Sequence, residues 1–334
     1  MSLRFRGWMP LALLSVLIVA IAVYAGAREP AFYSDYNLRN LLLTTMPLAL
    51  VALGQTNALL VGGFDVSVAA LVTMCIVVAS FTMPAGAAWW VLIPGALALV
   101  GVGLATGVFN ATLIRVLGLP SIIATLGTLS ILQGGALLLR DHPEGPISGE
   151  AIDVLTWSVG FLPLAFVGVV LLAVAADLWL YRSRRGLAVR AVGLDETSAR
   201  RLGMSTGRVV FGAFVVCSLM AALGGFYAAA QVQIGSPIVG GYALESIAAA
   251  VLGGASLAGG RGSFVGALLA AVFLSLIKNV LPLFQQPTEY AQITIGALIL
   301  LALLLYQGPE LARRFRSSWQ GVGRLRTRGA TPAG

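Results

Sequence analysis

Long apolar runs separated by short polar stretches make up most of the chain. A helix that crosses a bilayer needs about 20 apolar residues, because the hydrocarbon holds no water to satisfy a free backbone group. We therefore predict an all-α polytopic membrane protein, with residues 1–334 forming a single transmembrane domain. The predicted spans lie at about 9–27, 38–61, 65–83, 88–114, 121–139, 160–181, 209–232, 243–258, 263–283 and 290–306.

Two places interrupt this pattern. Gly62, Gly63 and Asp65 separate the second apolar run from the third, and the run at 243–258 is short. We expect broken or re-entrant helices at both. The first run has signal-peptide features, with Arg4 and Arg6 ahead of it and Ala25-Gly26-Ala27 as a candidate cleavage site. Because so many spans follow, we interpret it as a retained anchor, with a cleaved signal as the alternative.

Composition and charge agree with a membrane protein. The chain is 58% hydrophobic and 10% charged, against about 25% charged residues in soluble domains. Positive residues near span ends stay in the cytoplasm. Placing both termini inside assigns 17 of the 21 lysines and arginines to the cytoplasm, most of them in the loop 182–208 and the basic tail 307–334. The net charge of +8 therefore indicates orientation rather than nucleic-acid binding.

This orientation also suggests an internal symmetry. The group of segments two to five begins with a span that starts outside, and the group of segments seven to ten begins with a span that starts inside. Inverted repeats produce this arrangement. The two halves show no clear sequence similarity, so the inverted repeat is an expectation from topology alone.

The loop 182–208 contains the signals of a short helix. The signals are the N-cap residue Asp195, the acid Glu196 in the first turn, the bases Arg200 and Arg201 in the last turn, and the terminating Gly203. We predict a helix of about seven residues, with Ala199 and Leu202 on one face. Since so short a helix is unstable alone in water, it either docks on another surface or is a basic loop lying on lipid headgroups.

The sequence contains no recognisable catalytic or metal-binding set. The single histidine, His142, lies in a polar outer loop, and Cys75 and Cys217 lie in apolar runs. GASLAGGRG at 254–262 has the glycine spacing of a phosphate loop, but Gly260-Arg261 stands where Lys and Ser or Thr should follow. We expect no catalytic residue, metal or cofactor in this chain, so that any ATP and Mg²⁺ would be bound by a partner ATPase.

Polar side chains within the spans are candidates for a translocation pathway. Such groups are costly in lipid unless they face the bundle interior. They are Gln55, Thr56, Asn57, Asp65, Ser67, Asn110, Thr125, Thr128, Gln133, Glu245, Ser246 and Asn279. Amides and hydroxyls dominate, which favours a neutral polar solute. The alternative is that they bond the helices to one another.

Four blocks resemble the ribose-type monosaccharide permeases of bacterial ABC importers, in the same order along the chain. They read GGFDVSVAALV at 62–72, LPSIIATLGTLSILQGGALLL at 119–139, RRGLAVRAVGLDETSARRLGM at 184–204 and GYALESIAAAVLGGASLAGGRGSFVGALLAAVFLSLIKN at 241–279. The resemblance implies a multi-pass subunit of the inner membrane that forms a dimer with a second copy or a related permease. It also implies a periplasmic sugar-binding protein, a cytoplasmic ATPase and alternating access.

The resemblance places the family's ATPase-coupling element on 193–203. The coupling residues that it implies are Gly193, Asp195, Glu196, Ala199, Arg200, Arg201, Leu202 and Gly203. Of these, Gly193, Ala199, Arg200 and Gly203 keep the family's pattern. Leu194-Asp195 and the extra Arg201 depart from the family's usual pattern. The resemblance therefore gives neither the exact contacts with the ATPase nor the identity of the matching ATPase. Asp65 and Ser67 match a family motif without an assigned role, and Glu245 stands where the family more often has Asp.

Other solutes and mechanisms fit the same sequence. ABC permeases for branched-chain amino acids, nucleosides or sugar-like signals are alternatives. An ion-coupled secondary transporter is a further alternative, but it requires intramembrane acids or a histidine relay. For that role the chain offers only Asp65, Asp177 and Glu245.

Overall fold

The computed structural model describes residues 3–238, 240–287, 289–298 and 300. The chain divides into two compact units, Met1–Ala291 and Gln292–Gly334. In the second unit the described residues 292–298 and 300 are helical. Residues 299 and 301–306 of the predicted span 290–306 lie outside the described residues, as does the predicted basic tail 307–334.

Long apolar helices form the first unit, which confirms the predicted all-α polytopic membrane fold. Within the described residues, seven are long and apolar enough to cross a membrane. They are α1 (Leu3–Arg28), α2 (Asp35–Leu60), α4 (Leu92–Arg115, preceded by η2, Trp89–Val91), α5 (Ser121–Leu139), α7 (Leu164–Arg182), α10 (Thr206–Val232) and α12 (Phe264–Leu283). Two shorter apolar helices are α3 (Val68–Thr82) and α11 (Tyr242–Leu252).

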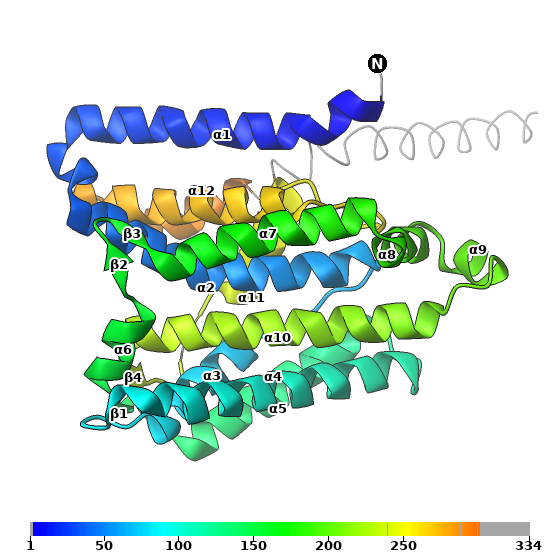
Figure 1. The fold of residues 1–334 in the computed structure, drawn as a ribbon, viewed down its shortest axis with the longest axis horizontal. Coiled ribbons are helices and arrows are strands. Elements are labelled where there is room, and N and C mark those ends of the chain that lie inside the picture. The colour runs from blue at the N-terminus through cyan, green and yellow to red at the C-terminus, as the bar shows by residue number, and fades with distance from the viewer. Residues whose placement is uncertain (1–2, 239, 288, 299, 301–334) are drawn as a thin grey trace, which may run out of the picture. The chain divides into compact units, whose positions relative to one another are not determined.

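Short elements gather at the two ends of the long helices (Figure 1). At one end lie β1 (Glu144–Pro146), α6 (Gly149–Leu155), β2 (Ser158–Val159), β3 (Leu162–Pro163) and β4 (Ile234–Gly235). There β1 pairs with β4 and β2 with β3, both antiparallel. At the other end lie α8 (Arg184–Leu194) and α9 (Glu196–Arg201). A 3-10 turn, η1 (Pro30–Tyr33), joins α1 to α2.

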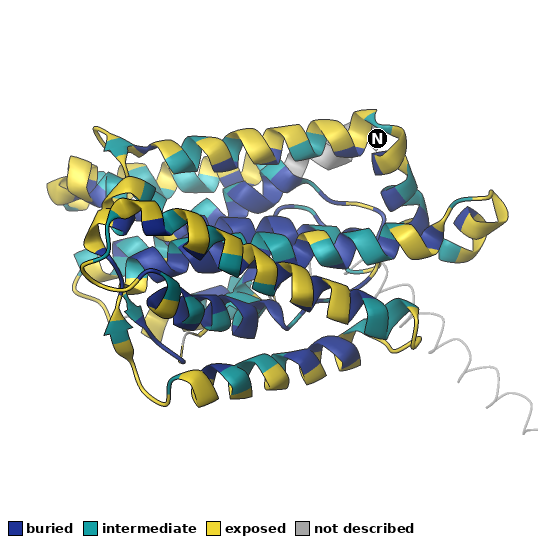
Figure 2. Cartoon of the chain, turned by 60° about the horizontal axis from the view of Figure 1, so that its bottom comes forward, coloured by how far each residue is buried: buried dark blue, intermediate teal, exposed yellow. Residues whose placement is uncertain are grey.

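Helix α10 packs closely on α2, α3 and α4 because glycines remove side chains at the crossings. Gly54 of α2 meets the Cys217 carbonyl of α10, and Gly225 of α10 meets Cys75 of α3. Gly103 and Gly107 of α4 likewise meet α10. Lipid tails are as apolar as leucine, so close backbone packing of this kind holds membrane helices together. Exposed apolar side chains lie mostly on α1, α4, α5 and α7. Figure 2 shows the exposed residues on the outer faces of the helices and the buried ones between them.

The chain breaks where glycines interrupt the apolar pattern. Helix α2 ends at Leu60, Gly62 has φ +75°, and α3 begins at Val68. Helix α11 has 11 residues, after which the chain turns through Gly254, Gly259 and Gly260, all with positive φ. At 1.5 Å per residue α11 is about 16 Å long, too short for a hydrocarbon core of about 30 Å. The run 243–258 is therefore a short helix followed by a loop.

Candidate functional site

The segment between α7 and α10 folds into two helices, of which only the second was predicted from the sequence. Ser183 accepts a hydrogen bond from the Gly186 amide at 2.9 Å and caps α8. A serine directly before Arg184 is an ordinary N-cap signal, and it could have revealed this helix. Gly186 lies against the backbone of Trp179 and Leu180, so α8 turns back on the end of α7 without a side chain between them.

Helix α9 follows the predicted capping pattern. The Asp195 carboxylate accepts hydrogen bonds from the amides of Thr197 at 2.9 Å and Ser198 at 3.2 Å, and from the Ser198 hydroxyl at 2.6 Å. The helix ends at Arg201, and Gly203 has φ +79°. The predicted N-cap and the predicted stop are confirmed, and the helix is six residues long rather than seven.

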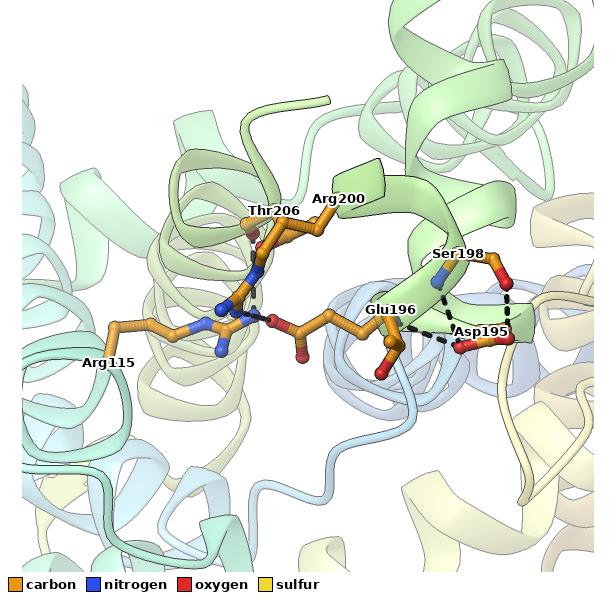
Figure 3. A network of polar contacts seen from close by, with 7 residues as sticks. Arg115, Asp195, Glu196, Ser198, Arg200 and Thr206 are labelled. Atoms are coloured by element: carbon orange, nitrogen blue, oxygen red, sulfur yellow. Dashed lines mark hydrogen bonds and ion pairs between the residues drawn. The ribbon is translucent and has the colours of Figure 1, made fainter. Parts of the chain in front are cut away.

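Four residues, Arg115, Glu196, Arg200 and Thr206, form what we call the α9 network, which joins α9 to α4 and α10 (Figure 3). Glu196 Oε1 accepts hydrogen bonds from Arg115 Nη2 and from Arg200 Nη2, each at 2.9 Å. Arg115 also donates to the Thr206 carbonyl at 3.4 Å, and Arg200 donates to the Thr206 hydroxyl at 3.5 Å. Arg115 ends α4 and Thr206 begins α10, so three elements meet at one carboxylate. The sequence indicates Arg115 only as a cytoplasmic positive charge.

Both carboxylates at the start of α9 have lowered pKa values. Partial burial raises the pKa of Glu196, but hydrogen bonds from Arg115 and Thr206 and the Arg115 charge outweigh burial, and the pKa lies below 4.5. Hydrogen bonds from Ser198 lower the pKa of Asp195 below 3.8. Both groups are therefore ionised at neutral pH, which suits the positive end of the helix dipole.

The outer side of α9 carries exposed apolar and charged groups, which we call the tip surface: Leu194, Asp195, Arg200, Arg201 and Leu202. Ala199 and Leu202, which we predicted to share a face of α9, differ in burial. Ala199 is buried, whereas Leu202 follows the last helical residue and is 77% exposed. The exposed Leu202 side chain therefore belongs to the tip surface.

Glycines hold the α8–α9 corner against two other chain breaks, a contact that we call the glycine junction. Gly193 lies on the Leu60 carbonyl at the end of α2 and on the Gly260 backbone. The Gly260 amide donates to the same Leu60 carbonyl at 2.9 Å, and Gly259 lies on the Gly193 carbonyl. A Cβ atom at Gly193 would overlap Leu60 O. Backbone from α8, α2 and the α11–α12 loop is therefore in direct contact.

Asp177 of α7 caps α12 from outside that helix. Its carboxylate accepts hydrogen bonds from the Phe264 amide at 2.7 Å, the Ser263 hydroxyl at 2.7 Å and the Val265 amide at 3.2 Å. One turn further along α7, the Tyr181 hydroxyl donates to the Gly262 carbonyl at 2.7 Å. These bonds tie the C-terminal end of α7 to the start of α12 and occupy the Asp177 carboxylate.

Four of the predicted pathway residues form one hydrogen-bonded group, which we call the buried cluster: Asp65, Ser67, Asn110 and Thr128. The Ser67 hydroxyl donates to Asp65 Oδ1 at 2.5 Å and accepts from Asn110 Nδ2 at 2.9 Å, while Thr128 donates to Asn110 Oδ1 at 2.6 Å. All four are buried. The cluster bonds the α2–α3 break to α4 and α5, and Thr125 adds a bond from the Val66 amide at 3.3 Å.

Four further candidates make no described side-chain hydrogen bond to another element. Thr56, Asn57 and Ser246 donate to the carbonyls of Ala52, Leu53 and Ala243. Gln55 is fully buried, and its amide hydrogen-bonds no described residue.

The remaining candidates bond different elements to one another. Gln133 donates to the Pro237 carbonyl at 2.8 Å, and Asn279 pairs with Asn37 of α2 at 2.9 Å. Both Glu245 carboxylate oxygens lie 2.7 Å from Lys278 Nζ. The predicted pathway residues are thus distributed over several contacts, and only the buried cluster brings a group of them together.

Comparison with known proteins shows which family this chain resembles. Residues 37–303 match the family described as "Branched-chain amino acid transport system / permease component". The ribose import permease protein of Escherichia coli (strain K12) is 32% identical over 300 residues, 87% of this chain and 92% of the relative. The autoinducer 2 import system permease protein of Klebsiella pneumoniae is 36% identical over 311 residues, 90% and 88% of the two chains.

A third relative, the autoinducer 2 import system permease protein of Yersinia enterocolitica, is 33% identical over 305 residues, which are 88% of this chain and 82% of the relative. The family match therefore covers the helices from α2 to α12, together with the α8–α9 segment and the chain breaks. The chain belongs to this family of ABC importer permeases.

Proposed function

We propose that this chain is the permease subunit of an ATP-driven importer that carries a monosaccharide or similar small neutral polar solute across the inner membrane. The proposal rests on the structure and contacts of α9. It is a capped helix at one end of the bundle with exposed Leu202 and Arg200, and it is bonded to the ends of α4 and α10. A separate cytoplasmic ATPase docks on this tip surface, and its movement switches the bundle between outward and inward access.

The solute class rests on the relatives and on the polar groups inside the bundle. The relatives are named for ribose and for autoinducer 2. In the described spans, Asp177 caps α12 and Glu245 is neutralised by Lys278. A zwitterionic amino acid, which the family's description suggests, requires fixed charges that are free to meet it. Neutral amides and hydroxyls suit a sugar better.

The same contacts argue against ion coupling. A coupling carboxylate has to exchange its ion during transport, whereas Asp177 holds a helix end through three hydrogen bonds. Asp65 is held in the buried cluster by the Ser67 amide and hydroxyl. The loop 254–262 uses its glycines to turn the chain and to contact Gly193, and we assign ATP and Mg²⁺ binding to the partner ATPase.

The partners follow from the same proposal. A periplasmic binding protein delivers the solute and supplies most of the selectivity. The pathway is completed by a second copy of this chain or by a related permease. Both chain ends lie in the cytoplasm, together with α8 and α9, in keeping with the positive charges of the loop 182–208.

Transport by the reconstituted complex tests the proposal. The chain is co-purified with its ATPase and placed in liposomes with ATP inside and the binding protein outside, and uptake of labelled ribose, autoinducer 2 and leucine is measured. We expect uptake of ribose or autoinducer 2 that requires ATP and continues when an uncoupler abolishes the ion gradients. Uptake that stops with the uncoupler, or uptake of leucine alone, would contradict the proposal.

Substitutions in the tip surface test the docking role. Leu202→Asp or Arg200→Glu should abolish uptake and weaken ATPase binding by at least about tenfold, since interface anchors contribute more than about 1.4 kcal/mol. The folded yield should not change, because both side chains are exposed. Val154→Asp on α6, also exposed but at the opposite end of the bundle, is the matched control. Normal uptake by both tip variants would refute docking at α9.

A further inference from the structure

We propose that Arg115 is a positioning residue: its ion pair with Glu196 ties α9 to the inner end of α4, so that α4 follows α9 when the ATPase moves it. The inference rests on the proposed function and adds a second route of transmission. Helix α9 is already joined to α8 and α10 by the chain itself. Arg115, which lies 81 residues before Glu196, adds a connection to a helix that the chain does not supply.

The geometry places Arg115 well for this role. It is in the last turn of α4, where a cation is favoured by the helix dipole, and Glu196 is in the first turn of α9, where an anion is favoured. The side chains are 20% and 37% exposed, so solvent reaches the pair without separating it. Arg115 also bonds the Thr206 carbonyl, which brings the start of α10 into the same contact.

Stabilising α9 does not by itself require Arg115. Arg200, one turn after Glu196 in the same helix, already supplies the usual i,i+4 partner to the same carboxylate oxygen. Asp195 supplies the N-cap. What Arg115 adds is a link between elements, and because the pair is partly open to solvent, its contribution to folding stability is small.

Helix α4 can carry the displacement inward. Asn110 lies five residues before Arg115 on α4 and bonds both Ser67 at the α2–α3 break and Thr128 on α5. Gly103 and Gly107 press the middle of α4 against α10. A shift of Arg115 along the α4 axis therefore reaches the buried cluster through one continuous helix and two hydrogen bonds.

Charge exchange across the pair tests the inference in the permease–ATPase complex in liposomes. The variants are Arg115→Glu, Glu196→Arg and the double exchange, with Arg115→Gln as a milder change that avoids two adjacent carboxylates. Arg208→Glu makes the same charge change at an exposed position in the first turn of α10 and is the control. For each variant, ATPase binding and the ATP hydrolysed per labelled ribose delivered are measured, with autoinducer 2 replacing ribose if wild type delivers only that solute.

We expect the single exchanges to bind ATPase within about twofold of wild type, because the pair is not part of the tip surface. ATP consumed per solute should rise by about fivefold or more, the lower range of measured allosteric couplings. The double exchange should recover part of this ratio, and Arg208→Glu should leave it unchanged. A merely structural pair would instead lower the folded yield and leave the ratio constant.

Three results would overturn the inference. An unchanged ratio in Arg115→Glu and Arg115→Gln would show that α4 needs no tie to α9. Loss of ATPase binding in these variants would place Arg115 in the docking contact itself. Failure of wild type to bind the ATPase or to deliver either solute would overturn the proposed function, and the inference with it.

Discussion

Helix α4 carries a fully buried amide, Asn110, and, five residues later, a partly exposed charged residue, Arg115. Asn110 belongs to the buried cluster, in which every side chain is at most 3% exposed. Arg115 belongs to the α9 network, whose charged side chains are between 20% and 70% exposed. The buried cluster surrounds one carboxylate with hydroxyl and amide groups, whereas the α9 network consists of a carboxylate shared by two arginines.

The difference teaches which contacts can be remade. A hydrogen bond broken in the buried cluster leaves a polar group without water or partner, at a cost of about 1–3 kcal/mol, so that the cluster favours one arrangement. A contact broken in the α9 network is replaced by water, and exposed ion pairs are worth only about 0–1 kcal/mol. The buried cluster therefore holds the α2–α3 break, α4 and α5 in one arrangement, while the α9 network links α9 to α4 and α10 through an ion pair that solvent can reach.

The largest expected effect on stability comes from the centre of the buried cluster. Ser67→Ala removes the hydroxyl that donates to Asp65 and accepts from Asn110, so we expect a loss of about 2–3 kcal/mol in unfolding free energy. Thermal unfolding in detergent measures it. Ser130→Ala on α5 is the control, because that exposed hydroxyl bonds only the Leu126 carbonyl of its own helix. Equal melting temperatures for the two variants would contradict the contrast between buried and exposed groups.

A smaller loss is expected at the edge of the cluster. Thr128→Val keeps the side-chain shape but removes the donor to Asn110, and we expect about 0.6–1.5 kcal/mol, as for other hydrogen bonds between membrane helices. Thr112→Val on α4, whose hydroxyl bonds only the Val108 carbonyl, is the matched control and should change stability less. If Thr128→Val is as stable as this control, the bond between α4 and α5 contributes nothing.

The smallest effect is expected in the α9 network and concerns ionisation. Because hydrogen bonds and charge from Arg115 lower the pKa of Glu196, Arg115→Ala should raise that pKa toward 4.5, and Arg200 should keep it from rising fully. A lowered pKa in the folded chain means that the ion pair stabilises fully above pH 4.5 and weakens as pH falls through the folded value. NMR titration of selectively labelled glutamate measures the shift. An unchanged Glu196 pKa in Arg115→Ala would contradict the ion pair. A large fall in the melting temperature of that variant would contradict the small contribution of the pair to stability.

Features that depend on neighbouring residues were predictable from the sequence. The positions of the long helices follow from the length of each apolar run, because the bilayer imposes that length. The break after Leu60 follows from Gly62 and Gly63, and the cap of α9 follows from Asp195. In each case the signal and the structure lie within one turn of each other, so local chemistry was sufficient.

Only the tertiary structure decided the contacts between distant segments. The partner of Glu196 is Arg115, the partner of Gly193 is Leu60, and Asp177 caps a helix that begins 87 residues later. Neither composition nor periodicity indicates such pairs, because a carboxylate accepts from any donor within reach and the fold alone brings the donor there. The exposure of Leu202 is of the same kind, since it depends on where a six-residue helix ends against its neighbours.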